Sequence, residues 1–197
     1  MRKGIVRCLA AAILFGATTP AASRLVREMG AFTLAGLLYL GAAIFVLPFA
    51  VRSRPTKAAV VRGSFQLTVA VVLGGAVGPV LLAAGLGYVP AATASLLLNL
   101  ELVFTTILAA LFFGEYLGRG VITGTAFMVV AGLTLSWSGG ADLRIGALLI
   151  SGACLCWGID NCVTASMDQF SPSQITLVKG IIAGGTNLAI GLVLNGA

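Results

Sequence analysis

The chain contains no histidine and few charged side chains. Only 9% of its 197 residues are charged, whereas soluble domains carry about 25%. So few charges cannot cover a surface in contact with water, which excludes an ordinary soluble domain and most soluble enzymes. Without histidine, and without the patterns H-E-x-x-H and G-x-S-x-G, metal-dependent and triad hydrolysis are improbable. We therefore expect no enzymatic activity, no cofactor and no metal site.

The sequence is rich in long apolar stretches. Hydrophobic residues make up 59% of the chain, and a membrane-spanning helix requires roughly 20 consecutive, mainly apolar residues. Seven stretches satisfy this requirement, over residues 4–22, 32–51, 65–87, 91–113, 120–137, 145–165 and 175–194. The sequence therefore predicts an all-α fold, a polytopic transmembrane bundle of about seven spans whose first partner is the lipid bilayer.

The basic residues indicate how the chain is oriented in the membrane. The net charge of +6 would suggest nucleic acid for a soluble protein, but here the basic residues lie in short loops and we expect no nucleic-acid partner. Arginine and lysine are enriched in cytoplasmic loops. The side of the N-terminus holds Arg2, Lys3, Arg7, Arg52, Arg54, Lys57, Arg62 and Arg119, and the opposite side holds Arg24, Arg27 and Arg144. We predict a multi-pass protein of the cell (plasma or inner) membrane with a cytoplasmic N-terminus.

Glycine pairs at four-residue spacing occur in three of the apolar stretches. Such pairs let two helix backbones approach closely in a membrane. They are Gly74 and Gly78, Gly120 and Gly124, and Gly180 and Gly184. We expect them to mediate helix packing within the bundle, and a homo-oligomer is a further possibility.

Two segments of the chain resemble each other at an offset of about 140 residues, which suggests an internal repeat. Phe15-Gly16 in the first apolar stretch matches Trp157-Gly158 in the sixth, and residues 32–39 match residues 172–179. The offset contains five spans, an odd number, so the second copy enters the bilayer inverted. Inverted repeats are typical of secondary transporters.

The fourth apolar stretch carries a family resemblance. Residues 90–115, PAATASLLLNLELVFTTILAALFFGE, resemble the fourth-helix signature of EamA-type transporters of the drug/metabolite transporter superfamily, with Leu102 where the family often has proline. The aromatic-glycine pairs of the repeat are similar to the start of each EamA repeat. The resemblance implies two five-helix repeats, so residues 1–140 would form the first and residues 141–197 two helices of an incomplete second. A chain truncated in this way is expected to have an open-sided cavity and to transport poorly or not at all by itself.

Glu101 is the sharpest candidate for a functional residue. It lies near the middle of the fourth apolar stretch, where an ionisable group is costly unless it is paired or faces water. It is either a substrate contact or proton carrier in a central cavity, or a structural glutamate bonded to a neighbouring helix.

Five further residues are candidates for the substrate or proton pathway, each with a structural alternative. Trp157 could stack on a substrate, with Asp160 as a second ionisable group in the pathway and Asn161 beside it. Alternatively, Trp157 is only the aromatic residue that recurs in the repeat, and Asp160 and Asn161 form a polar helix end. Thr18 either faces substrate or satisfies a carbonyl freed by Pro20. Lys179 either snorkels to the interface, pairs with Asp160, or contacts an anionic substrate.

The leading functional hypothesis is a secondary transporter, expected to be an exporter, that moves small metabolites or drugs by alternating access, with proton coupling as an option. Its substrate class is implied by the resemblance. A retinal-binding photoreceptor is disfavoured because Lys179 is close to a helix end and the third apolar stretch has no carboxylate. The alternative is a non-catalytic assembly or regulatory membrane protein, or a non-functional fragment of a transporter.

Overall fold

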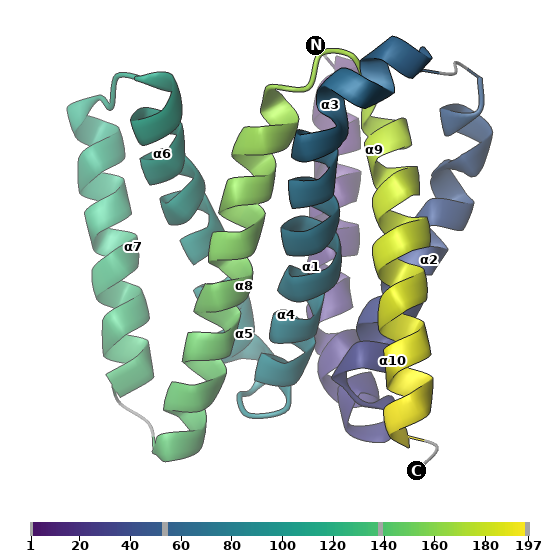
Figure 1. The fold of residues 1–197 in the computed structure, drawn as a ribbon. Helices are drawn as coiled ribbons and strands as arrows, with labels where there is room; N and C mark the ends of the chain where they lie inside the picture. Colours follow the sequence, from purple (N-terminus) through teal and green to yellow (C-terminus); the bar gives the residue numbers. More distant parts are fainter. Residues whose placement is uncertain (1, 53–54, 138–139, 196–197) are drawn as a thin grey trace.

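The computed structural model describes residues 2–52, 55–137 and 140–195, and within these ranges every regular element is helical. Seven helices are long and apolar enough to cross a membrane, which confirms the predicted all-α bundle. They run alternately up and down, so the two ends of the chain lie at opposite ends of the bundle (Figure 1). Arg54 falls outside the described residues.

Four of the spans are uninterrupted α-helices, and three are built from shorter elements. The uninterrupted helices are α1 (Arg2–Met29), α2 (Ala31–Ala50), α7 (Arg119–Trp137) and α8 (Ala141–Ala165). The third span consists of α3 (Lys57–Val69), η1 (Ala70–Val77) and α4 (Gly78–Leu86), the fourth of α5 (Ala91–Leu97) and α6 (Leu100–Phe113), and the seventh of α9 (Pro172–Lys179), η2 (Gly180–Gly184) and α10 (Gly185–Asn195).

The elements η1 and η2 are π-helical segments inside the third and seventh spans. Both are rich in glycine, and Pro79, two residues after the end of η1, has no backbone N–H to donate to the preceding turn. A π-helical turn leaves backbone carbonyls without their usual partners, and such turns are frequent at functional sites. In η1 two of these carbonyls accept hydrogen bonds from side chains on other spans: Gly74 O from Tyr39 and Trp157, and Ala76 O from Asn187.

The fourth span is interrupted at Leu98 and Asn99, where the apolar stretch alone predicted one continuous helix. The Asn99 amide turns back and donates to the carbonyls of Ser95 and Leu96, at 3.2 and 3.0 Å. Because of this break, Glu101 lies in the first turn of α6 and not in the middle of a helix. The positive end of a helix dipole stabilises a negative charge at that position.

The seventh span packs against α2 in an antiparallel pair. Residue numbers rise along one helix as they fall along the other, in the contacts Thr33 with Gly191, Gly36 with Leu188, Leu40 with Gly184, and Ala43 with Gly180. A Cβ placed on Gly180 would lie 2.5 Å from the Tyr39 carbonyl oxygen, so the two backbones touch there. Gly180 and Gly184 therefore sit at a close helix approach.

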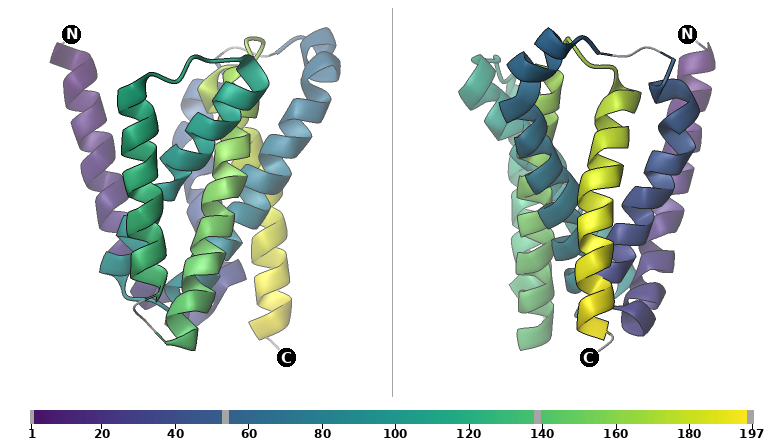
Figure 2. Two further views of the ribbon diagram at one scale, coloured as in Figure 1. Left: turned by 90° about the vertical axis from the view of Figure 1, so that its left-hand side faces the viewer. Right: turned by 45° about the vertical axis from the view of Figure 1, so that its right-hand side comes forward.

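The helices α1 and α7 lie at the edge of the bundle. The N-terminal half of α1 leans away from the other spans (Figure 2), and α7 stands at the left-hand edge of the bundle in Figure 1. A Cβ on Gly120 or Gly124 in α7 would meet nothing within 4 Å. The expectation that this pair mediates close packing is therefore not met, because no other helix of the described ranges reaches that face of α7.

Candidate functional site

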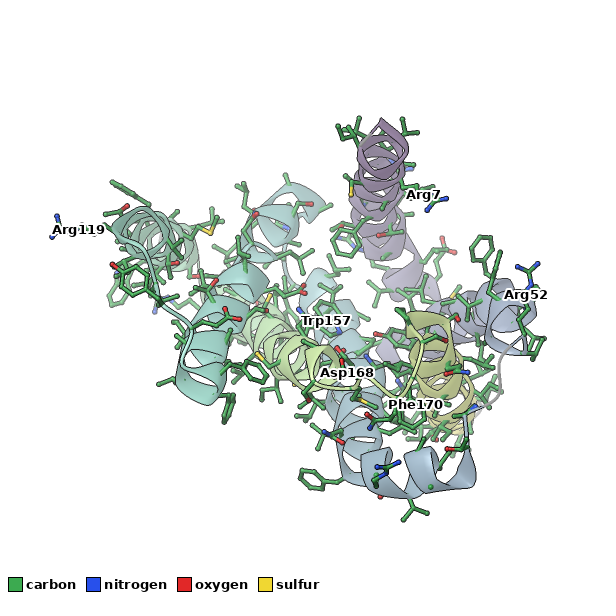
Figure 3. All side chains as sticks on the ribbon, turned by 90° about the horizontal axis from the view of Figure 1, so that it is seen from above. Arg7, Arg52, Arg119, Trp157, Asp168 and Phe170 are labelled. Carbon is green, nitrogen blue, oxygen red and sulfur yellow. The ribbon has the colours of Figure 1, made fainter. Side chains whose placement is uncertain are left out.

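A cavity of about 380 Å³ opens between α1, α2, α4, α6 and α8. Most of its wall is aliphatic, and three aromatic rings and three polar side chains interrupt it. The aromatic residues are Phe15, Tyr39 and Trp157, and the polar ones are Thr18, Glu101 and Asn161. Five of the seven spans therefore meet around one hollow, and Trp157 lies near the centre of the bundle seen from above (Figure 3).

Two larger hollows lie along α7, with volumes of about 510 and 490 Å³. Their walls are mainly aliphatic, and neither contains a carboxylate. Binding sites for small molecules combine apolar walls with a few placed polar groups, and the cavity that contains Glu101 fits that description best.

The Glu101 carboxylate is held by one residue of the cavity wall, Asn161, whose amide also contacts Thr105. Asn161 of α8 donates from Nδ2 to Glu101 Oε1 at 2.9 Å, and the same amide nitrogen lies 3.3 Å from Thr105 Oγ1. Thr105 follows Glu101 by four residues in α6, so it lies one turn further along the same face. These contacts fix the carboxylate without neutralising it.

The polar atoms of Tyr39 and Trp157 point away from the cavity. Tyr39 Oη donates to the Gly74 carbonyl at 2.6 Å, and Trp157 Nε1 donates to the same carbonyl oxygen at 3.1 Å. The π-helical segment η1 thus anchors both rings from behind. The ring surfaces, and not their donors, are what the two residues offer to the cavity.

We expect Trp157→Phe to destabilise the protein by about 1 kcal/mol or more, because the smaller phenyl ring loses the N–H donor to Gly74 and part of the packing of the indole. The check is the unfolding temperature of the purified protein in detergent. Trp137→Phe is the matched control, since the Trp137 side chain is exposed. Equal losses in the two variants would contradict the role of the bond to Gly74.

Asp160 and Lys179 form a buried ion pair between α8 and the seventh span. Asp160 Oδ2 accepts from Lys179 Nζ, and the two side chains, Lys179 and Asp160, are only 12% and 9% exposed. The other carboxylate oxygen, Asp160 Oδ1, is buried without a hydrogen-bond partner among the described residues. The carboxylate lies directly against Gly74, where a Cβ would overlap it. Lys179 therefore does not snorkel to the membrane surface.

The structure separates the predicted site residues into two groups. Thr18, Glu101, Trp157 and Asn161 line the cavity, whereas Asp160 and Lys179 do not. The Thr18 hydroxyl donates to the Phe15 carbonyl at 2.6 Å, one turn earlier in α1. The carbonyl that Pro20 leaves without a backbone donor is that of Gly16, four residues before the proline.

Sequence reasoning missed Tyr39 and Thr105. Tyr39 had a signal, because it occupies the position of Lys179 in the match between residues 32–39 and 172–179. Both positions face η1 in the structure: Tyr39 bonds to Gly74, and Lys179 holds the carboxylate that lies against Gly74. Thr105 had no signal, since nothing in its neighbourhood distinguishes it from the other hydroxyl residues of the span.

Comparison with protein families agrees with this architecture. The model of the EamA-like transporter family matches residues 2–137. The chain belongs to this family. No curated protein and no solved structure matches it. EamA-like proteins are transporters and not enzymes, so the seven apolar helices are those of a membrane transporter-like domain, with the lipid bilayer around it.

Proposed function

We propose that the chain acts in secondary transport, moving small metabolites or drugs out of the cell by alternating access, and that the cavity around Glu101 is its substrate site. Membership of the EamA-like family supports the transport function. The observation that carries the assignment of the site is a carboxylate placed at a helix interruption, facing a cavity of suitable size inside the bundle. An ionisable residue within the membrane is by default a functional candidate.

The same carboxylate is the proposed point of proton coupling. Glu101 is bonded to an amide and not to a cation, so uptake of a proton would remove its charge without breaking an ion pair. The Asp160–Lys179 pair, which the cavity does not reach, has a structural role in this proposal.

Ligand binding by the purified full chain tests the site. A ligand that binds the folded state alone raises the unfolding temperature, so a panel of metabolites and drugs is screened by this readout. The Glu101→Gln variant is expected to lose the response to the compounds that stabilise the wild type. Glu115→Gln is the matched control, because Glu115 lies in the exposed loop after α6. Compounds that stabilise Glu101→Gln as strongly as the wild type would place the binding site elsewhere.

Flux into proteoliposomes tests transport itself. The compounds found by binding are expected to show only slow flux, which increases with an imposed pH gradient, and Glu101→Gln is expected to lower it further. Binding without flux, with or without the gradient, would contradict the transport proposal while leaving the site intact.

We also propose that the N-terminus is cytoplasmic. The start of α1, the end of α2 and the start of α7 lie at the same end of the bundle (Figure 1), and Arg7, Arg52 and Arg119 lie in or next to these helix ends. Positive charge favours the cytoplasmic side. A phosphatase reporter, which is active only outside the cytoplasm, is expected to be inactive when fused in the 166–171 loop and active when fused in the 87–90 turn. The reverse pattern would contradict the orientation.

A further inference from the structure

The cavity contains one negative charge that no cation of the described chain neutralises. Two carboxylates of the spanning helices, the buried Asp160 and the partly buried Glu101, have different surroundings. Asp160 is paired with Lys179, whereas Glu101 accepts only the amide of Asn161. Glu101 is also the one charged side chain that lines the cavity. A charge of this kind at low dielectric attracts an opposite charge far more strongly than it would in water.

The rest of the wall offers ring surfaces and few free donors. The hydroxyl of Tyr39 and the indole N–H of Trp157 are both committed to Gly74, and the hydroxyl of Thr18 is committed to Phe15. An anionic substrate would find neither a cation nor an uncommitted donor among these groups. Aromatic faces, in contrast, attract cations, with tryptophan the strongest and tyrosine and phenylalanine following.

We infer that the cavity selects monovalent organic cations, namely quaternary or protonated amines with an apolar or aromatic body. The nitrogen would lie beside Glu101, and the body would lie against Phe15, Tyr39 and Trp157. This inference rests on the proposed function, that the cavity is the substrate site. The volume of about 380 Å³ is within the range of small-molecule pockets, about 300–1,000 Å³.

Three probes of similar shape but different charge test the inference. Benzyltrimethylammonium is the cation, neopentylbenzene replaces its nitrogen by carbon, and phenylmethanesulfonate is the anion. Binding is followed by the fluorescence of Trp157 in a Trp137→Phe background, in which Trp157 is the only tryptophan, with free probe concentrations set by equilibrium dialysis. We expect saturable binding of the cation, affinity weaker by about tenfold or more for the neutral probe, and no binding of the anion.

The variants separate the role of charge from that of shape. Glu101→Gln is expected to weaken binding of the cation by about tenfold or more and to leave the neutral probe unchanged. Glu115→Gln is expected to change neither affinity. Equal affinity for the cation and the neutral probe, or cation binding that survives in Glu101→Gln, would overturn the inference and leave the cavity as a binding site. If none of the probes binds, the inference fails together with the assignment of the cavity as the substrate site.

Discussion

Lys179→Met is expected to destabilise the folded protein by about 3–5 kcal/mol, because removal of one partner from a buried ion pair strands the other charge. No second partner would compensate the Asp160 charge, since Oδ1, its other carboxylate oxygen, already lacks a hydrogen bond among the described residues. Asp160 also cannot move toward the third span, because its carboxylate is in contact with Gly74. The measurement is the unfolding temperature of the purified protein in detergent, together with the yield of monodisperse protein.

Two controls isolate the ion pair from the loss of a lysine. The double variant Asp160→Asn with Lys179→Met removes both charges, and we expect it to recover most of the lost stability, since replacing a buried pair by neutral groups is often nearly neutral. Arg119→Met removes an exposed cation that points away from the bundle (Figure 3) and is expected to change stability little. A double variant as unstable as Lys179→Met would contradict the account.

Gly180→Leu is the second change with a large expected effect. At this position a Cβ would lie 2.5 Å from both the Tyr39 carbonyl oxygen and the Ala43 Cβ. Backbone atoms cannot turn aside as a flexible side chain can, so α2 and the seventh span would have to separate. Overpacking typically costs about 1–3 kcal/mol, occasionally more, and a four-carbon side chain against backbone is expected at or above the upper end.

Gly185→Leu is the matched control within the same span. A Cβ on Gly185 meets nothing within 4 Å, so the leucine should project into open space with a change of at most about 0.5 kcal/mol. Unfolding temperatures of the two variants, measured in the same detergent, give the comparison. If both substitutions destabilise the protein equally, the effect belongs to helix propensity or hydrophobicity and not to the contact with α2.

The glycine pairs show how much of the packing was predictable. Gly120 and Gly124 have the same spacing as Gly180 and Gly184, and both pairs lie in apolar stretches. Only the second pair is in contact with another helix, because α2 runs along that face of the seventh span while α7 lies at the edge of the bundle. Spacing along one helix indicates that close approach is possible, but it contains no information about which helix approaches.

In the candidate site, too, the sequence indicated single residues but not which residues they contact. Glu101 could be selected from the sequence, since a carboxylate in a long apolar stretch is conspicuous wherever the helix packs. Its partner Asn161, sixty positions away in α8, could be suspected only as a polar residue in a span. The shared acceptor of Tyr39 and Trp157 is the Gly74 carbonyl in the π-helical segment η1, and no sequence pattern predicted that segment.

The amino-acid sequence by itself determined the seven spans, their all-helical structure and the presence of an intramembrane carboxylate. These are local properties of each segment. The bilayer interior offers no water as a hydrogen-bond partner, so a spanning segment must pair its own backbone groups by forming a helix. Only the tertiary structure decided that Asp160 is paired with Lys179 while Glu101 is left facing a cavity. Pairing of polar groups depends on which helix faces meet, and the apolar stretches that create the spans are too much alike to specify it.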